Sequence, residues 1–464
     1  MLLIYTKANT NRFSYITEVL FTSVWLVKYR ITLHQDEFLA FDGLKINYSD
    51  ERISPDEIWI QPHSLLFEKG ISPQQTDTFE WQGYQAFFKT GGDMPFDIFA
   101  ASFYLITRYE EYLPHQKDEY DRYAHTNSLA FKKGFLHLPL VNLWLKEMFQ
   151  VFGFKFQGSG LPSHHSPFTI DNSRFPIDDS RFTFPVSRFP IHVSRFTYTP
   201  TYDIDIAYAY NGKGIVRNIG SFCKDLLTRK WKMVAERIKF YSGMGNDPFD
   251  TYQWLHGLHE KYQLTPIYFF LLAARHRLYD KNIPPQSKVM KRLVQQHAQK
   301  YSVGIHPSWQ SGDDEQLLNK EIITLSCISD NPIQKSRQHY IRIEIPSTYR
   351  LLISKGITEE YSMGYGSING FRASVASPFY WYDVENDIKT NLLIRPYCYM
   401  EANSFFEQRY TAEQAAVELQ QYHDVVKAVG GELITIFHNH FVTEQPQWVA
   451  WRNMYADFLE RNFG

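Results

Sequence analysis

Two carboxylates two residues apart, Asp203 and Asp205, are the first side chains in this sequence whose spacing suggests chemistry. They follow a β-branched and aromatic run, 196–202, which predicts a β-strand. Residues i and i+2 of a strand project to the same side, so both carboxylates would point together from its C-terminal end, where α/β folds gather functional groups. Two anions this close require a metal, another cation or a shared proton. The alternative is a solvated strand end that happens to carry two acidic residues.

Three further polar side chains lie at the ends of predicted strands. His306 ends a strand over 302–305, Arg372 lies in a short strand over 370–373, and His438 ends an apolar strand over 432–437. A single histidine at a strand end is more often structural. Together with the aspartate pair, and each at the carboxyl edge of a strand, these residues favour a metal hydrolase.

The elements that must position these residues alternate between strand and helix after residue 198. A nearly continuous apolar run over 265–273 is typical of a buried parallel strand. Further strands are predicted over 337–343, 348–355 and 390–394, and helices over 251–262, 287–301, 314–329 and 412–429. This alternation predicts an α/β fold class, with a complete or partial (β/α) barrel in the C-terminal region, 198–464.

The N-terminal region, 1–165, is predicted to form a smaller α/β domain. Short strands are expected over 2–5, 30–33, 44–48 and 57–61, and helices over 12–24, 96–113 and 139–152. The second of these helices ends in Arg108, Glu110 and Glu111, which we interpret as an ion-pair cluster at the surface. No catalytic set of residues is recognised in this region.

Residues 166–197 carry the triplet Ser-Arg-Phe four times, beginning at Ser173, Ser180, Ser187 and Ser194. Prolines within the repeats exclude a continuous helix, and an odd period of seven does not keep one face of a strand. We predict an exposed, poorly ordered insert or linker between the two domains.

Bulk composition excludes several classes of protein. The 464 residues carry a formal charge of −2 and include 44% hydrophobic residues, so no nucleic-acid or polybasic membrane partner is expected. The three cysteines are scattered, which argues against a disulfide framework or a cysteine-rich zinc site. No signal peptide and no apolar run of membrane-spanning length is recognised, so the expected location is cytoplasmic.

Several longer stretches carry a resemblance to a known family: PFDIFAASFYLITRYEEYLP, TYDIDIAYAY, DPFDTYQWL, GIHPS, SRQHYIR, YSMGY and GFRA. With them the chain resembles the NodB-homology polysaccharide deacetylases of carbohydrate esterase family 4. It is most similar to a Bacteroidetes-type subgroup that has an N-terminal domain of unknown function. The resemblance implies an irregular, seven-stranded barrel as the catalytic domain and a divalent metal, zinc, as cofactor.

The resemblance also implies the roles of individual residues. Asp203 matches the general base, while Asp205 and His306 match metal ligands. The family's second metal-binding histidine would stand four residues after His306, where this sequence has Gln310, a poorer zinc ligand than imidazole. His339, on a predicted strand, is the candidate replacement, and a supporting or substrate-contact role is its alternative.

Arg372 matches the arginine that orients the base through an ion pair. His438 matches the histidine that protonates the leaving group, with a pKa expected near the ordinary value of about 6.5. Tyr340, Tyr365 and Trp381 are candidate sugar-stacking residues, with core packing as the alternative for most of them.

The implied activity is metal-dependent removal of an N-acyl group, acetyl, from an amino sugar in a glycan or glycan precursor. A second hypothesis is hydrolysis of a non-sugar C–N bond in a small amide, since some relatives act on cyclic amides. The third is a degenerate deacetylase fold that binds a glycan or a partner without turnover, which the glutamine at position 310 supports.

Overall fold

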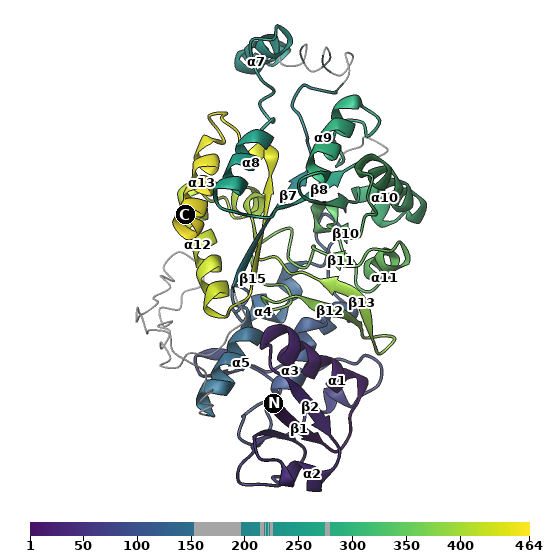
Figure 1. Cartoon of the computed structure of the whole chain (residues 1–464), viewed down its shortest axis with the longest axis vertical. Helices are drawn as coiled ribbons and strands as arrows, with labels where there is room; N and C mark the ends of the chain where they lie inside the picture. Colours follow the sequence, from purple (N-terminus) through teal and green to yellow (C-terminus); the bar gives the residue numbers. More distant parts are fainter. Residues whose placement is uncertain (153–195, 214–217, 219, 221, 223–225, 274–278) are drawn as a thin grey trace. The chain divides into compact units, whose positions relative to one another are not determined.

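The computed structural model describes residues 1–152, 196–213, 218, 220, 222, 226–273 and 279–464. The chain forms two compact units (Figure 1). The first comprises Met1–Thr197, Gly370–Cys398 and Gln421–Leu433, and the second Tyr198–Asn369, Tyr399–Gln420 and Ile434–Gly464. The first unit thus includes two segments that the sequence assigns to the C-terminal domain. Of the predicted insert, 166–197, residues 166–195 lie outside the described residues, and Thr197 already belongs to a strand.

In the first unit, four parallel strands form a sheet in the order β2-β1-β3-β4, and the four predicted N-terminal strands are confirmed. Their bounds are β1 Leu2–Thr6, β2 Tyr29–Thr32, β3 Leu44–Tyr48 and β4 Ile58–Ile60. Every residue of β1 is buried, as expected for a central strand. Two antiparallel pairs also belong to this unit: β5 Phe79–Trp81 with β6 Tyr84–Ala86, and β12 Phe379–Asp383 with β13 Ile388–Ile394.

The helices of the first unit are α1 Asn11–Glu18, which continues as a π-helix over Val19–Val24, α2 Gln35–Ala40, α3 Ile98–Ile106, α4 Leu129–Lys132 and α5 Leu140–Val151. Helix α3 begins at Asp97, whose carboxylate accepts hydrogen bonds from two backbone amides of the first turn. A short 3₁₀ helix, Tyr109–Tyr112, follows it.

The charged end of α3 is buried, so its interpretation as a surface cluster is wrong. Arg108 and Glu111 have side chains 1% and 2% exposed, and Arg108 Nε donates to Glu111 Oε1 over 2.7 Å. Glu110 accepts a second bond from Arg108 at 2.7 Å. Burial requires each of these charges to be paired within the protein rather than by water.

The second unit contains seven strands among the described residues, in the order β11-β10-β9-β8-β7-β15-β14. Their bounds are β7 Thr197–Ile204, β8 Ile267–Leu271, β9 Ser302–His306, β10 Lys335–Ser336, β11 Glu359–Glu360, β14 Tyr399–Met400 and β15 Glu432–His438. Parallel pairing is observed from β7 through β11, and β14 is parallel to β15. In the described part of the chain no pairing joins β11 to β14, so closure of the predicted barrel is not observed.

The register of this sheet places the polar side chains at the ends of β7 and β9 at one edge. Asp203 pairs with Phe269 and His306 with Leu271, so the polar ends of β7 and β9 lie on either side of β8. All five residues of β8 are buried, which confirms the predicted buried parallel strand. The strand interior is apolar, and its carboxyl edge is therefore where polar side chains can collect.

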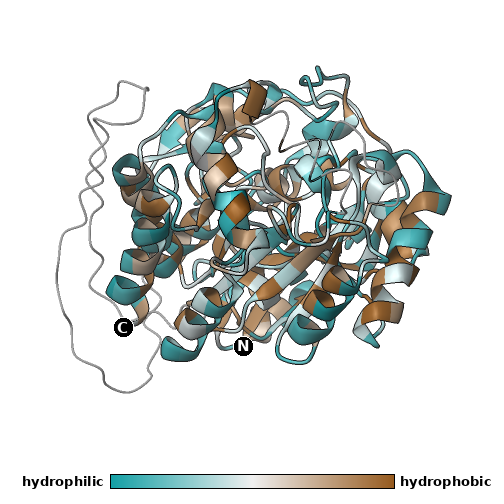
Figure 2. Ribbon diagram, turned by 90° about the horizontal axis from the view of Figure 1, so that it is seen from above, coloured by the Kyte–Doolittle hydropathy of each residue, from teal (hydrophilic) through white to brown (hydrophobic). Residues whose placement is uncertain are grey.

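The α-helices whose bounds are described in the second unit are α7 Trp231–Tyr241, α8 Tyr252–Lys261, α9 Lys288–Ala298, α10 Glu315–Ser329, α11 Ser347–Ser354, α12 Ala412–Ala428 and α13 Val449–Phe463. Helix α12 extends into the segment 421–433 of the first unit. The strand predicted over 348–355 is wrong, because α11 forms there and buries Tyr349 and Leu352, spaced i and i+3. Helices carry both hydrophilic and hydrophobic positions (Figure 2), as expected when one side packs against a sheet. Of the described helices, none is long and apolar enough to cross a membrane.

Candidate metal centre

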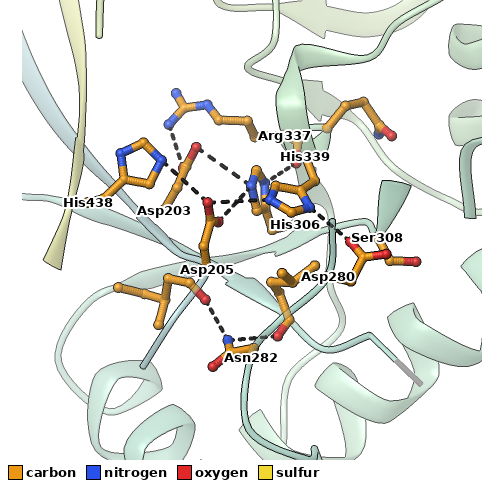
Figure 3. Close-up of polar contacts among 12 residues, drawn as sticks. Asp203, Asp205, Asp280, Asn282, His306, Ser308, Arg337, His339 and His438 are labelled. Atoms are coloured by element: carbon orange, nitrogen blue, oxygen red, sulfur yellow. Dashed lines mark hydrogen bonds and ion pairs between the residues drawn. The ribbon is translucent and has the colours of Figure 1, made fainter. Parts of the chain in front are cut away.

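Three side chains of the second unit converge at the carboxyl edge of its sheet (Figure 3). One ligand atom from each of Asp205, His306 and His339 lies within 4.8 Å of the others. His306 Nε2 is 3.1 Å from Asp205 Oδ1, and His339 Nε2 is 3.4 Å from Asp205 Oδ2. The structure thus brings together the three residues predicted as metal ligands, including the proposed replacement, His339.

The hydrogen bonds of the two imidazoles fix which nitrogen faces the cluster. His306 Nδ1 lies 2.6 Å from the backbone oxygen of Arg337, and His339 Nδ1 lies 2.9 Å from Asp280 Oδ1. Both partners are acceptors, so each Nδ1 must carry a hydrogen. In the neutral rings each Nε2 then presents a lone pair toward Asp205, which is how metal-binding histidines are commonly oriented.

In the absence of a cation, the pKa values of Asp205 and His339 are shifted by their mutual proximity. Burial would raise the pKa of Asp205, but the neighbouring charge of His339 and the hydrogen bond from His306 hold it well below its ordinary value. Burial would lower the pKa of His339, yet Asp205 and Asp280 raise it to about 9. Without a cation, the His339 imidazole is therefore protonated at neutral pH. One carboxylate and two oriented imidazoles are a donor set that fits a divalent cation such as zinc, which would displace that proton.

Arg337 orients the second carboxylate. Its Nη1 donates to Asp203 Oδ1 over 3.0 Å and to Thr201 Oγ1 over 2.6 Å, and its guanidinium lies 4.5 Å from the centre of the Phe269 ring. Asp203 Oδ2 lies 3.8 Å from His306 Nε2. One oxygen of Asp203 is therefore held by the arginine while the other lies near the ligand cluster.

The prediction that Arg372 pairs with Asp203 is corrected by this contact. The guanidinium of Arg372 instead pairs with Glu111, with Nε 2.8 Å from Oε1, in the first unit. The assignment rested on the resemblance at residues 370–373, which does not determine which arginine lies beside Asp203 in the fold. Arg337 directly follows β10, which pairs with β9, and this neighbour relation decides between them.

His438 approaches from β15 with a carboxylate behind it. Its Nδ1 lies 2.7 Å from Glu401 Oε1, which also accepts from the His438 backbone amide, and its Nε2 lies 3.5 Å from Asp205 Oδ2. Burial would lower the pKa of His438, but Glu401 and the two aspartates raise it to about 10 in the chain without a cation. The expected pKa near 6.5 is therefore corrected: this imidazole is held as a cation with an N–H directed at the cluster.

A buried amide fixes the end of β7. Asn282 donates to the backbone oxygens of Ile204 and Leu271 over 2.6 and 3.0 Å (Figure 3). Its own oxygen accepts from the Ala207 amide over 2.9 Å. These bonds tie β7 to β8 next to Asp205. The rigid strand end places the carboxylate without relying on a flexible loop.

Gln310 does not join the ligand cluster, because its amide donates over 3.3 Å to Asp280. Asp280 therefore receives bonds from both Gln310 and His339. Gln310 thus helps to hold Asp280, the acceptor beside His339 Nδ1.

The three predicted substrate-contact residues differ in burial and position. Tyr340 is half-buried and its ring lies 4.6 Å from that of His339, beside the cluster. Tyr365 is 2% exposed and Trp381 1% exposed, and Trp381 lies on β12 of the first unit. Their burial leaves core packing as the role of both. His440 is half-buried, 5.5 Å from the His438 ring, and burial and the charge of His438 lower its pKa to about 3, which keeps it neutral.

Sequence reasoning missed Arg337, Asp280 and Glu401. A signal existed for Arg337, because it stands two residues before His339, the same spacing that singled out the aspartate pair. Asp280 lies outside any regular element, and Glu401 follows a strand of two residues, too short for periodicity to reveal.

Comparison with known proteins gives a family match for the N-terminal part alone. Residues 2–157 match a family of unknown function, DUF7033, which covers less than half of the chain. A search of curated proteins finds no match.

Solved structures offer low-identity similarities. A polysaccharide deacetylase from Bacillus cereus is 10% identical, with 57% of this chain and 87% of that chain covered and a TM-score of 0.29. An allantoinase is 10% identical over 58% and 86%, with a TM-score of 0.37. A CE4 family pseudoenzyme from Bacillus anthracis is 10% identical over 60% and 66%, with a TM-score of 0.28. Similarity at this level leaves the function to be argued from the site itself.

Proposed function

We propose that the second unit is a metal-dependent hydrolase that removes an N-acyl group, most simply acetyl, from an amino sugar. The reaction cleaves an amide C–N bond with water and yields a carboxylic acid and a free amine. The observation that carries the proposal is that Asp203 and His438 both approach the ligand cluster. The Asp203 carboxylate is oriented by Arg337 and lies 3.8 Å from His306 Nε2, and the His438 imidazolium is held by Glu401 and lies 3.5 Å from Asp205 Oδ2.

The cation would be held by Asp205, His306 and His339, and zinc suits two imidazoles and a carboxylate best. When bound, it supplies Lewis acidity toward the acyl oxygen and lowers the pKa of water. Asp280 and the Arg337 backbone oxygen keep both imidazoles in the ligating orientation.

Asp203 serves as the base in this proposal. Its Oδ2 accepts a proton from the attacking water, while Arg337 holds Oδ1 so that the free oxygen keeps its position. Removing the arginine would leave the carboxylate buried and mobile, at 2% exposure.

His438 serves as the acid. Its Nε2–H donates a proton to the amine nitrogen as the C–N bond breaks, and Glu401 stabilises the imidazolium until that moment. The amine product then leaves neutral and takes up a further proton from solvent. Tyr340 stands beside the site, where an aromatic ring can stack on a sugar.

The test is acetate release from N-acetylglucosamine oligomers by the zinc-loaded full chain, with a panel of cyclic amides assayed in parallel. We expect wild type to release acetate, and Asp203→Asn to reduce the rate by about 10² or more. Asp457→Asn, which changes an exposed aspartate on α13, is the matched control and should retain the wild-type rate.

Turnover of a cyclic amide but of no acetylated sugar would contradict the proposed substrate class and would still support a hydrolase. No product from either panel, together with no stoichiometric metal in wild type by elemental analysis, would overturn the enzyme and favour the non-catalytic binding module.

A further inference from the structure

The segment around α7 exposes an unusual number of large apolar side chains. Six residues between positions 227 and 244 are more than a third exposed: Leu227 84%, Trp231 63%, Met233 39%, Ile238 51%, Tyr241 56% and Met244 75%. In Figure 1, α7 stands beyond the other labelled helices of its unit. Exposed apolar surface of this extent marks an interaction site more often than a solvated helix.

One side of α7 is anchored to the protein. Val234 is buried, and the Arg237 guanidinium lies 4.8 Å from the Tyr210 ring while its Nη1 donates to the Asn218 backbone oxygen over 3.2 Å. The same side borders a cavity of about 760 Å³ whose lining, which includes Phe240 and Tyr241, is largely apolar.

The exposed side forms a stripe. Trp231, Ala235 and Ile238 are spaced i, i+4 and i+7, which places them on one face of the helix, and all three are exposed. Tyr241 is exposed and also borders the cavity, so the apolar surface continues from the stripe into the hollow.

The charged residues of the segment 226–244 are predominantly basic. Arg229, Lys230 and Lys239 are exposed. The sole acidic residue of the sequence between positions 226 and 244 is Glu236, which accepts a hydrogen bond from the Gln445 side chain over 3.0 Å and is thus turned toward the protein. The exposed charge of the segment is therefore positive, although the chain as a whole carries −2.

We propose that α7 docks the protein onto the surface of an anionic lipid bilayer. A helix with tryptophan and isoleucine on one face and lysines beside them lies in the plane of a membrane interface, with the apolar side chains among the acyl chains and the ammonium groups on the lipid phosphates. The expectation of no membrane partner was drawn from whole-chain charge, and it overlooks this local segregation. The inference is independent of the proposed hydrolysis.

The test is co-sedimentation of the full chain with vesicles of phosphatidylcholine alone or with 30% phosphatidylglycerol. We expect binding to the anionic vesicles that weakens with added salt, and little binding to the neutral ones. Lys230→Glu and Lys239→Glu should each lower the partition coefficient about fivefold or more. The double variant Trp231→Ser/Ile238→Ser should lower it by roughly tenfold or more.

The matched control is on α10 of the same unit, where Lys320 is exposed and Ile323 is 51% exposed, like Ile238. Lys320→Glu/Ile323→Ser should bind vesicles as wild type does. Circular dichroism confirms that each variant folds. Absence of binding to anionic vesicles would overturn the proposal, as would equal loss in the α10 control. A dimer in light scattering that the double α7 variant dissolves, without vesicle binding, would assign the surface to a second copy instead.

Discussion

The buried ion cluster at the end of α3 makes a sharp prediction for stability. Glu111 stands between two guanidiniums, with its Oε1 2.7 Å from Arg108 Nε and 2.8 Å from Arg372 Nε, and its side chain is 2% exposed. Glu111→Gln keeps the shape of the side chain and removes its charge. Glu110 then remains as an acidic partner of Arg108.

The size of the loss follows from the pKa of Glu111. Burial would raise this pKa, but Arg372 and Arg108 together lower it from 4.5 to about 2. Each tenfold change in proton affinity is worth about 1.36 kcal/mol, so the carboxylate contributes ~3 kcal/mol of stability at neutral pH. Breaking a buried ion pair by removing one partner costs about 3–5 kcal/mol in other proteins, in agreement with this figure.

The pH dependence has a defined sign. Because the folded pKa lies below the unfolded one, the contribution is complete above about pH 4.5 and is lost as the pH falls toward about 2. Wild type should therefore lose stability across this range, and Glu111→Gln should lose less, since it lacks the titrating group.

Hydrogen exchange measured by mass spectrometry on peptides covering α3 is the suitable assay, because it reports the opening free energy of this region alone. At pH 7 we expect protection of the slowest amides to fall by roughly a hundredfold in Glu111→Gln. Glu119→Gln, at an exposed carboxylate in the same region, should leave protection unchanged. A loss below about 1 kcal/mol, or equal effects of the two variants, would refute the electrostatic reasoning.

Three further predictions concern variants of the second unit, one of them compared with a variant of the first unit. Arg337→Met should lower acetate release by about a hundredfold while metal content is retained. Arg372→Met should lower the melting temperature and leave the rate of the folded protein unchanged. The reverse result would make Arg372 the arginine that orients Asp203. Asp280→Asn should weaken zinc affinity about 10–100-fold in a chelator competition, because His339 loses the charge behind its Nδ1, and unchanged affinity would contradict this. Burial raises the pKa of Glu321 to about 7, so the wild-type protein loses stability as the pH rises from about 4.5 to 7. Glu321→Gln should therefore have a higher melting temperature than wild type at pH 8 and the same melting temperature at pH 5.

Much of the site could be predicted because its residues stand at strand ends. Asp205 directly follows β7 and His306 ends β9, and parallel pairing brings the carboxyl ends of such strands to one edge. His339 was identified by chemistry, since a missing imidazole called for another one nearby. None of these inferences needed side-chain packing.

The missed residues depend on tertiary contacts that no local pattern records. Arg337 and Arg372 are both 1% exposed or less, and which of them meets Asp203 depends on strand order. The helix α11 was mistaken for a strand because its β-branched residues outweighed a short i, i+3 pattern. Segment 370–398 carries no sequence feature that assigns it to the first unit.

The turn that follows β10 carries a consequence for metal loading. Tyr340 and Ile341 have positive φ values of 58° and 57°, a conformation that is costly for a β-branched residue and persists when the surroundings impose it. This turn connects His339 to the rest of the chain, and Arg337 is only two residues upstream. A cation bound to His339 would hold the turn in its strained form. Because the backbone from Arg337 to His339 is short, it would also hold Arg337 against Asp203. Cation binding at His339 and the position of Arg337 against Asp203 would then be thermodynamically coupled.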